Sequence, residues 1–598
     1  MAQTNSATEP IRPRRLPGSP KKTVRERLLH SLPAYTGPYD VGFLEIELPA
    51  RAPRSFASHI KRNGVPALQL DTVLFSVYYP SSRPPDKSAR AVTWLPRPRL
   101  ETSKGYAKFL SAPHLPVTAY IALTSMFTRL PAHRNVRLAS LGRRAAGEED
   151  ASQATLVGEQ EASGDEKEKP GEPRFPVIIF SHGLGGSRTS YSSVCGELAS
   201  FGLVVIAMEH RDGSGARTYV NKARSRDLES PELEKAGGLD KNREKDAPDD
   251  PRRDDETQPK SYYVVDYLFP KDNPLDTSPR NARGVDTELR RAQIDMRLAE
   301  IEEAFYVLGL INSGNGEEVR TQNLRKKGNV GSSSKGLERI DWRDWASQLF
   351  LDHVTLMGHS FGAATTVQAL RLERLSWVSQ GILLDTWGPA TPESTEQDRL
   401  KKPILSVGSE AFMHWKENHD RVETMCREAR TSGAPCWMVT IRGSTHLSQT
   451  DFAVLYPNWT SLLMKTIVNP KRAIHLTAHS ALEFLKTTLP SYQTRFNNNS
   501  EAWAGERLLS KATSGTKVLS DHRPDDKFVA TRLKIPHEFS LRLKGLVSRL
   551  RSQDPSVPTD TSGKPLVGLL NWGAGNEIWV HQSPTPNDVN HYMKQRDC

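Results

Sequence analysis

One short segment, residues 354–370, constrains the fold of this chain more than any other. A short, mostly apolar run at 354–357 leads into a Gly-x-Ser-x-Gly pentapeptide at 358–362, and small residues then begin a helix-like pattern. This arrangement is typical of a nucleophile elbow, in which a serine sits on a strained turn and flanking glycines leave room for neighbouring backbone. The helix start would place backbone N–H groups near Ser360, where negative charge develops during acyl transfer. The segment therefore predicts a strand–elbow–helix unit with Ser360 as nucleophile, and the alternative is an ordinary glycine-bounded turn.

Short apolar runs recur on both sides of this segment and are separated by helix-length stretches. Strand, helix and strand in that order indicate βαβ units and a parallel sheet. The expected strands are 41–48, 72–79, 175–180, 203–208, 354–357, 381–385, 403–410 and 437–446. The expected helices are 110–130, 191–201, 287–310 and 539–550. We interpret 110–130 as a buried helix, with a membrane-touching helix as the alternative.

Composition limits the kind of partner that the chain can have. Lys and Arg number 81 against 70 Asp and Glu, a net charge of +11 in which both signs are interspersed. That distribution argues against a nucleic-acid groove and is compatible with a mild attraction to anionic membranes. Four scattered cysteines, no visible secretory signal and no apolar run of bilayer length predict a cytoplasmic protein without a transmembrane segment, with a location peripheral to membranes as the alternative.

The domain organisation follows from shifts in composition. Residues 1–30 are basic and rich in Pro and Ser, and we expect a disordered arm there. Residues 31–490 would form one catalytic domain, and 491–598 an irregular C-terminal extension. Charged insertions are expected at about 143–173, 213–285 and 313–336.

A serine hydroxyl needs a base to take its proton, and the base needs a third group to fix its tautomer. In α/β-hydrolases these groups follow strands in the order serine, acid, histidine. Ser360, an acid and His446 come in that order here, each after an apolar strand. Asp385 ends one strand and Glu410 the next, so position alone leaves the acid open between them.

The second oxyanion donor should come from the glycine-rich loop at 182–186. We expect the backbone N–H groups of Leu184 and Phe361 to serve as donors. We interpret His182, His210 and His359 as structural. The sequence suggests no metal site and no cofactor.

Six ordered motifs together resemble the platelet-activating-factor acetylhydrolase family, both its plasma and its intracellular type II members. The matching segments are 35–42, 180–185, 207–212, 358–362, 381–387 and 440–446. The resemblance covers about 35–490 and implies an α/β-hydrolase fold, with a mostly parallel central sheet flanked by helices and interrupted by charged insertions. It also implies a catalytic triad of Ser360, Asp385 and His446, with Leu184 and Phe361 as oxyanion donors.

The activity implied by the resemblance is calcium-independent hydrolysis of a short or oxidised sn-2 acyl ester of a phospholipid. We expect the chain to depart from the plasma members in having no secretory signal, and its second residue is alanine where the type II members carry a myristoylated glycine. Two alternatives to a phospholipid esterase are considered. One is a general carboxylesterase or lipase acting on another ester, and the other is a non-catalytic lipid-binding scaffold.

Overall fold

The computed structural model describes most of the region in which a folded domain is expected. The described residues are 31–81, 91–139, 174–222, 261–331, 336–494, 503, 505–514, 535, 538–540, 542–543 and 577–596.

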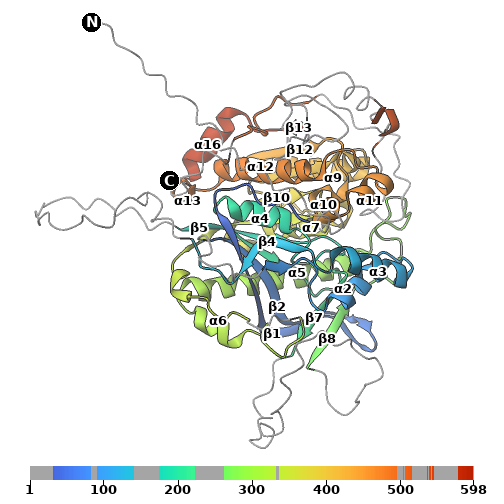
Figure 1. The fold of residues 1–598 in the computed structure, drawn as a ribbon. Helices are drawn as coiled ribbons and strands as arrows, with labels where there is room; N and C mark the ends of the chain where they lie inside the picture. The colour runs from blue at the N-terminus through green and yellow to red at the C-terminus, as the bar shows by residue number, and fades with distance from the viewer. Residues whose placement is uncertain are drawn as a thin grey trace, which may run out of the picture.

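An eleven-stranded sheet runs through the centre of this part of the chain (Figure 1). Its strands lie in the order β13-β12-β11-β10-β9-β5-β6-β2-β1-β4-β3. The bounds are β1 (Asp40–Arg62), β2 (Val65–Ser81), β3 (Ala91–Thr93), β4 (Arg129–Arg134), β5 (Phe175–Ser181), β6 (Val204–Met208), β9 (Leu349–His359), β10 (Val378–Leu384), β11 (Ile404–Ser409), β12 (Cys436–Ile441) and β13 (Ile578–Gln582). The run from β6 through β5, β9, β10 and β11 to β12 is parallel throughout.

Helices cover both faces of the sheet, which explains the nearly continuous apolar runs of its central strands. Alternate residues of β5 enter different cores: Val177 and Ile179 pack in the cluster that includes α5, α7 and α9, whereas Ile178 and Phe180 pack in the cluster that includes α4 and α12. The helices are α2 (Arg99–Phe109), α3 (His114–Ser125), α4 (Ser192–Ser200), α5 (Thr287–Asn312), α6 (Gly316–Gln322), α7 (Phe361–Arg371), α8 (Glu410–Met413), α9 (Lys416–Thr431), α10 (Asp451–Leu455), α11 (Pro457–Leu463), α12 (Pro470–Thr488), α13 (Ser491–Thr494) and α16 (Pro586–Arg596). This is the α/β-hydrolase fold that the sequence predicts.

The best-predicted helix is α5, expected at 287–310 and found at Thr287–Asn312. Its start is fixed by Asp286, whose side chain accepts a hydrogen bond from the backbone N–H of Leu289. Such a cap satisfies one of the amide groups that a helix start leaves unpaired. The spacing of the apolar residues therefore predicted the helix, and the capping residue fixes where it begins.

The first two strands are much longer than predicted, because their outer halves leave the central sheet and pair only with each other. Residues 51–62 of β1 carry mostly exposed side chains, so they lack the apolar pattern by which the strand was recognised. Ala50, Leu68 and Leu70 still bury against Met296 of α5. Packing against α5 thus stabilises an outer part of the β1–β2 hairpin that the pattern of apolar residues alone does not predict.

The expected insertions correspond only partly to what the structure describes. Residues 143–173 and 223–260 lie outside the described residues. Residues 213–222 are almost wholly buried rather than a surface insertion, and β7 (Arg217–Asn221) pairs with β8 (Tyr262–Asp266) in a small second sheet. Within 313–336, helix α6 forms and the buried Arg325 makes an ion pair of 2.9 Å with Glu47.

The C-terminal extension is less irregular than expected. Strand β13 pairs antiparallel with β12 and so extends the central sheet, and α16 follows it. The helix expected at 539–550 lies mostly outside the described residues. No helix in the described part of the chain is long and apolar enough to cross a bilayer.

Candidate active site

Ser360 occupies the turn between strand β9 and helix α7 with φ 57° and ψ −115°. A positive φ is uncommon for a non-glycine residue and is imposed here by tight packing on both sides. A Cβ on Gly358 would lie 2.2 Å from the carbonyl oxygen of Gly362, and a Cβ on Gly362 would lie 2.0 Å from that of Ser181. Both glycines of the pentapeptide are therefore required by the turn that holds Ser360.

Asp385 and His446 meet although they come from different strands. Asp385 follows β10 and His446 follows β12, and the His446 Nδ1 atom lies 2.6 Å from Asp385 Oδ2. Ser409 donates its backbone N–H to Asp385 Oδ1 at 2.6 Å and its hydroxyl to Oδ2 at 2.9 Å. Because Nδ1 is engaged by the carboxylate, Nε2 is the ring nitrogen left to accept a proton.

The elbow and the acid are also joined through the backbone. The Ser360 N–H donates to the carbonyl oxygen of Leu384 at 2.8 Å, and the Trp387 N–H donates to the carbonyl oxygen of Ser360 at 3.3 Å. Asp385 lies between these two partners in sequence and itself has φ 41°. The serine turn and the carboxylate turn thus hold each other in place.

The His446 ring is fixed from two sides. The Phe412 ring stacks on it with centroids 4.3 Å apart and planes at 6°, and the His359 ring lies 4.5 Å away. His359 Nε2 also lies 3.0 Å from the carbonyl oxygen of His446, and burial holds the pKa of His359 well below its ordinary value. His359 therefore supports the His446 loop as a neutral ring.

Glu410 is close by but makes different contacts. Its Oε2 accepts the Gly443 N–H at 2.6 Å, and its own N–H donates to Ser444 Oγ at 3.3 Å. Burial raises the pKa of this carboxyl group. The structure therefore brings Asp385 against His446 and places Glu410 under the loop that leads to it.

The glycine-rich loop after β5 lies directly against the serine. A Cβ on Gly183 would come within 2.9 Å of Ser360 Cβ. The N–H groups of Gly183 and Gly185 are engaged, donating to Tyr191 Oη at 3.1 Å and to the carbonyl oxygen of Ser214 at 2.8 Å. Within the described residues, neither the Leu184 N–H nor the Phe361 N–H has a hydrogen-bond acceptor. The two expected oxyanion donors are thus free to bind one.

Buried charged side chains also hold the glycine-rich loop at 182–186 in place. Arg297 pairs with Asp212 at 2.7 Å and donates to the carbonyl oxygen of His182 at 2.9 Å. Burial lowers the pKa of His182 to about 4 and that of His210 well below its ordinary value. Both histidines are neutral and hydrogen-bonded within the scaffold.

Comparison with known proteins places this fold and site in a family. The model of the family described as platelet-activating factor acetylhydrolase, isoform II, matches residues 151–506. The chain belongs to this family. The acetylhydrolase of Gallus gallus is 31% identical over 325 residues, covering 54% of this chain and 63% of that protein. That of Canis lupus familiaris is 27% identical over 318 residues, covering 53% and 57%. The chain therefore matches somewhat less than two thirds of the length of these relatives.

Two further similarities extend over more of the chain. A protein of Schizosaccharomyces pombe described as a putative phospholipase A2 is 25% identical over 490 residues, which is 76% of this chain and 91% of that protein. A solved ferulic acid esterase from Streptomyces cinnamoneus is 16% identical with a TM-score of 0.41, covering 76% of this chain and 92% of that one.

Sequence reasoning missed three residues that position the site of this family member: Tyr191, Ser409 and Phe412. Tyr191 Oη lies 2.9 Å from His359 Nδ1 and also accepts the Gly183 N–H, so it links the elbow to the loop. Ser409 caps helix α8 by accepting the Phe412 N–H, and a serine at a strand-to-helix junction was the available signal. Nothing in the local pattern marks Tyr191 or Phe412.

Proposed function

We propose that the protein is a calcium-independent serine esterase that removes a short or oxidised sn-2 acyl chain from phospholipids such as platelet-activating factor. The carrying observation is the Asp385–His446 contact of 2.6 Å beside the strained Ser360 turn. Membership in a hydrolase family supports the reaction type, and the short acyl chain is our inference from the acetylhydrolases that the chain resembles.

In the proposed reaction the Ser360 hydroxyl attacks the ester carbonyl carbon while His446 Nε2 takes its proton. Asp385 stabilises the imidazolium that forms, and the N–H groups of Leu184 and Phe361 bind the oxyanion. His446 then gives the proton to the departing lysophospholipid oxygen, leaving an acyl group on Ser360. A water molecule, deprotonated by His446, releases that group as a carboxylic acid.

Exposed apolar side chains support a substrate held at a lipid surface. Helices α3 and α11 are joined by a hydrogen bond of 2.6 Å from Trp459 Nε1 to Tyr120 Oη. The buried helix expected at 110–130 is wrong in length and burial: α3 covers only His114–Ser125, and its Leu115 and Leu123 are 85% and 76% exposed. Leu462 of α11 is 68% exposed. Contiguous exposed apolar residues are typical of interaction surfaces. We therefore propose peripheral membrane contact by a cytoplasmic protein, which vesicle sedimentation and cell fractionation test.

Turnover of phosphatidylcholines that differ only in the sn-2 chain tests the proposed substrate. We expect kcat/KM to fall steeply from acetyl to long unoxidised chains. Equal or higher turnover of simple non-phospholipid esters would favour a general carboxylesterase instead. A fluorophosphonate probe separates both from a scaffold, because a non-catalytic protein would leave Ser360 unlabelled.

A further inference from the structure

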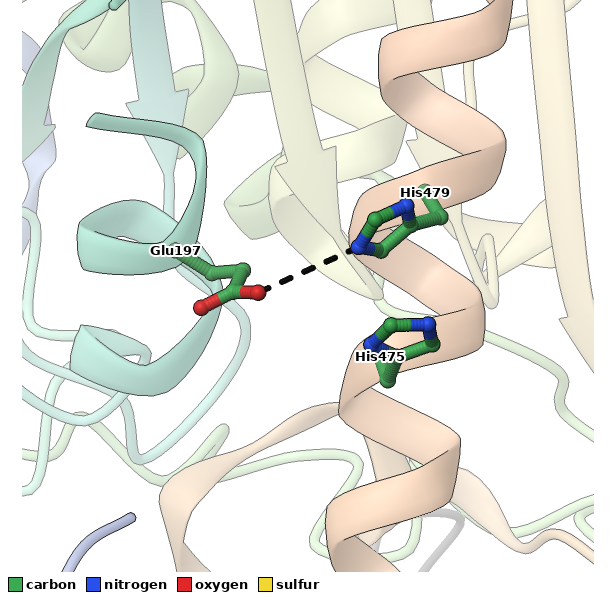
Figure 2. A group of neighbouring side chains, drawn as sticks. All are labelled: Glu197, His475 and His479. Atoms are coloured by element: carbon green, nitrogen blue, oxygen red, sulfur yellow. Dashed lines mark ion pairs between the residues drawn. The ribbon is translucent and has the colours of Figure 1, made fainter. Parts of the chain in front are cut away.

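A second group of ionisable side chains lies between helices α4 and α12 (Figure 2). His475 and His479 are four residues apart and so share one face of α12. Glu197 projects toward them from α4. Each of the three offers a potential ligand atom, and these atoms all lie within 4.8 Å of one another.

The His479 ring is the least satisfied member of this group. The residue is 9% exposed, and neither ring nitrogen has a hydrogen-bond partner among the residues that the structure describes. Its Nε2 faces Glu197 Oε1 across 3.9 Å, which is too long for a hydrogen bond. Buried polar groups without partners are rare in folded proteins and call for a ligand, an ion or water.

The other two members are held in position by neighbours. Glu197 accepts hydrogen bonds from Thr36, through the backbone N–H at 2.9 Å and through the hydroxyl. His475 Nε2 lies 2.6 Å from Glu506 Oε1. A carboxylate on the far nitrogen of a histidine is the arrangement that commonly orients metal-binding imidazoles.

The separation of 3.9 Å between His479 Nε2 and Glu197 Oε1 is within the reach of one zinc ion. Zinc binds imidazole nitrogen at about 2.0–2.1 Å and carboxylate oxygen at about 2.0–2.2 Å, so one ion can reach both atoms across this distance. Arg472, on the same helix, does not leave a free positive charge, because it is paired with Glu506 at 2.7 Å and Glu577 at 2.6 Å.

We propose that Glu197, His475 and His479 bind one zinc ion that joins α4 to α12. Two imidazoles and one carboxylate suit zinc rather than calcium, which prefers a shell of six to eight oxygens. The site is distinct from the His359, Asp385 and His446 group, which could also hold a metal by its spacing. The sequence predicted no metal site, because the two histidines show the spacing but the carboxylate comes from a distant part of the chain.

Zinc at this site would affect the glycine-rich loop that packs against Ser360. Helix α4 begins directly after Tyr191, which holds the Gly183 N–H, and α12 packs against α4. Bound zinc would therefore stabilise the helix that anchors the loop without touching a reacting group. The inference does not depend on the proposed substrate.

Zinc titration of the chelator-treated full chain, in competition with a chromophoric chelator, tests the proposal. We expect one equivalent to bind tightly, and His479→Ala and His475→Ala each to weaken it by about 100-fold or more. Glu197→Gln keeps the shape of the side chain but removes its charge, and we expect it to weaken binding by at least about tenfold. Zinc should also raise the Tm of the wild type and leave that of His479→Ala unchanged.

Two controls identify which site holds the ion. His59→Ala removes an exposed histidine paired with Glu288 at 2.6 Å, and His446→Ala removes the ring paired with Asp385 at 2.6 Å. Both variants should still bind one equivalent of zinc tightly. If zinc binding is unchanged in His475→Ala and Glu197→Gln, or is lost only in His446→Ala, the proposed site is wrong. Circular dichroism of each variant shows whether a loss reflects unfolding, and His475→Ala, at a half-buried position, keeps the test decisive if His479→Ala does not fold.

Discussion

Two serine–histidine–carboxylate groups can be compared within the described residues, and they differ in whether the serine stands on a nucleophile-elbow turn. In the second, Ser181 Oγ lies 2.8 Å from His210 Nε2, and His210 Nδ1 lies 2.5 Å from Glu300 Oε2. Judged by hydrogen bonds alone, this group is as complete as the Asp385–His446 pair.

The difference lies in what surrounds each serine. Ser181 belongs to the regular strand β5 and is wholly buried, with Arg297 beside the histidine. Ser360 is 5% exposed and stands on a strained turn, and among the described residues the N–H groups of Leu184 and Phe361 have no acceptor. Acyl transfer needs an accessible nucleophile and donors for the oxyanion as well as a base. The comparison shows that a connected triad is not sufficient evidence for a site.

The largest expected effect separates the two serines. Ser360→Ala should lower turnover by about 10⁴–10⁶-fold and leave the fold intact, because the nucleophile is lost. Ser181→Ala should keep activity within about tenfold and cost roughly 1–3 kcal/mol of stability, because His210 loses a buried partner. Turnover of a short-chain ester and urea unfolding measure the two effects. An alanine variant at 360 that retains a tenth of the activity would remove Ser360 as nucleophile.

The next effect concerns the carboxylates. Asp385→Asn should lower turnover by roughly two to four decades, since the amide no longer stabilises the tautomer that accepts the serine proton. Glu410→Gln should stay within about tenfold, because its contacts are to Gly443 and Ser444 rather than to the ring. Both variants are assayed on one ester. An inactive Glu410→Gln beside an active Asp385→Asn would reverse the assignment.

A smaller effect concerns stability and pH. Burial, followed by the charge of Asp212, raises the pKa of Glu300 from 4.5 to about 8. The folded state therefore keeps a proton that the unfolded chain releases, and stability falls as pH rises from about 4.5 to about 8. Glu300→Gln should make this slope shallower, by up to about 1.4 kcal/mol per pH unit. Urea unfolding at several pH values measures it.

The matched control for this slope is Glu318→Gln, an exposed carboxylate on α6. We expect its stability to follow the wild-type pH dependence. A Glu300→Gln variant with an unchanged slope would show that Glu300 is already ionised in the folded protein.

The smallest expected effect is on catalysis in the presence of chelator. We expect turnover of fresh enzyme to be unchanged in excess chelator, because the proposed chemistry needs no calcium. The Tm, in contrast, should fall if zinc leaves the α4–α12 site. Turnover that is lost in chelator and restored by calcium would contradict the metal-free mechanism.

Much of the central architecture could be predicted from the sequence, because buried parallel strands and amphipathic helices leave strong periodic signals. The strands β5 and β6 and helix α5 are confirmed in this way. The outer part of β1 could not be predicted, since its side chains are exposed and its pairing depends on α5 below it.

For the candidate site, the order of motifs predicts Ser360 as nucleophile and His446 as base but leaves the acid open. Position could not distinguish Asp385 from Glu410, because both follow strands and only the backbone path decides which one reaches the ring. The positioning residue Tyr191 was invisible for the same reason: its partners, Gly183 and His359, become neighbours only after folding.

The pairing of β13 with β12 has a consequence for synthesis on the ribosome. Strand β12 is apolar and wholly buried, and β13 is its outer neighbour. About 140 residues separate the end of β12 from the end of β13, so at 5–20 residues per second the nascent chain has an uncovered β12 edge for roughly 7–28 s. Such an edge can pair with other chains. Premature termination after residue 446 and before β13 would therefore yield a product that contains every proposed catalytic residue and yet aggregates.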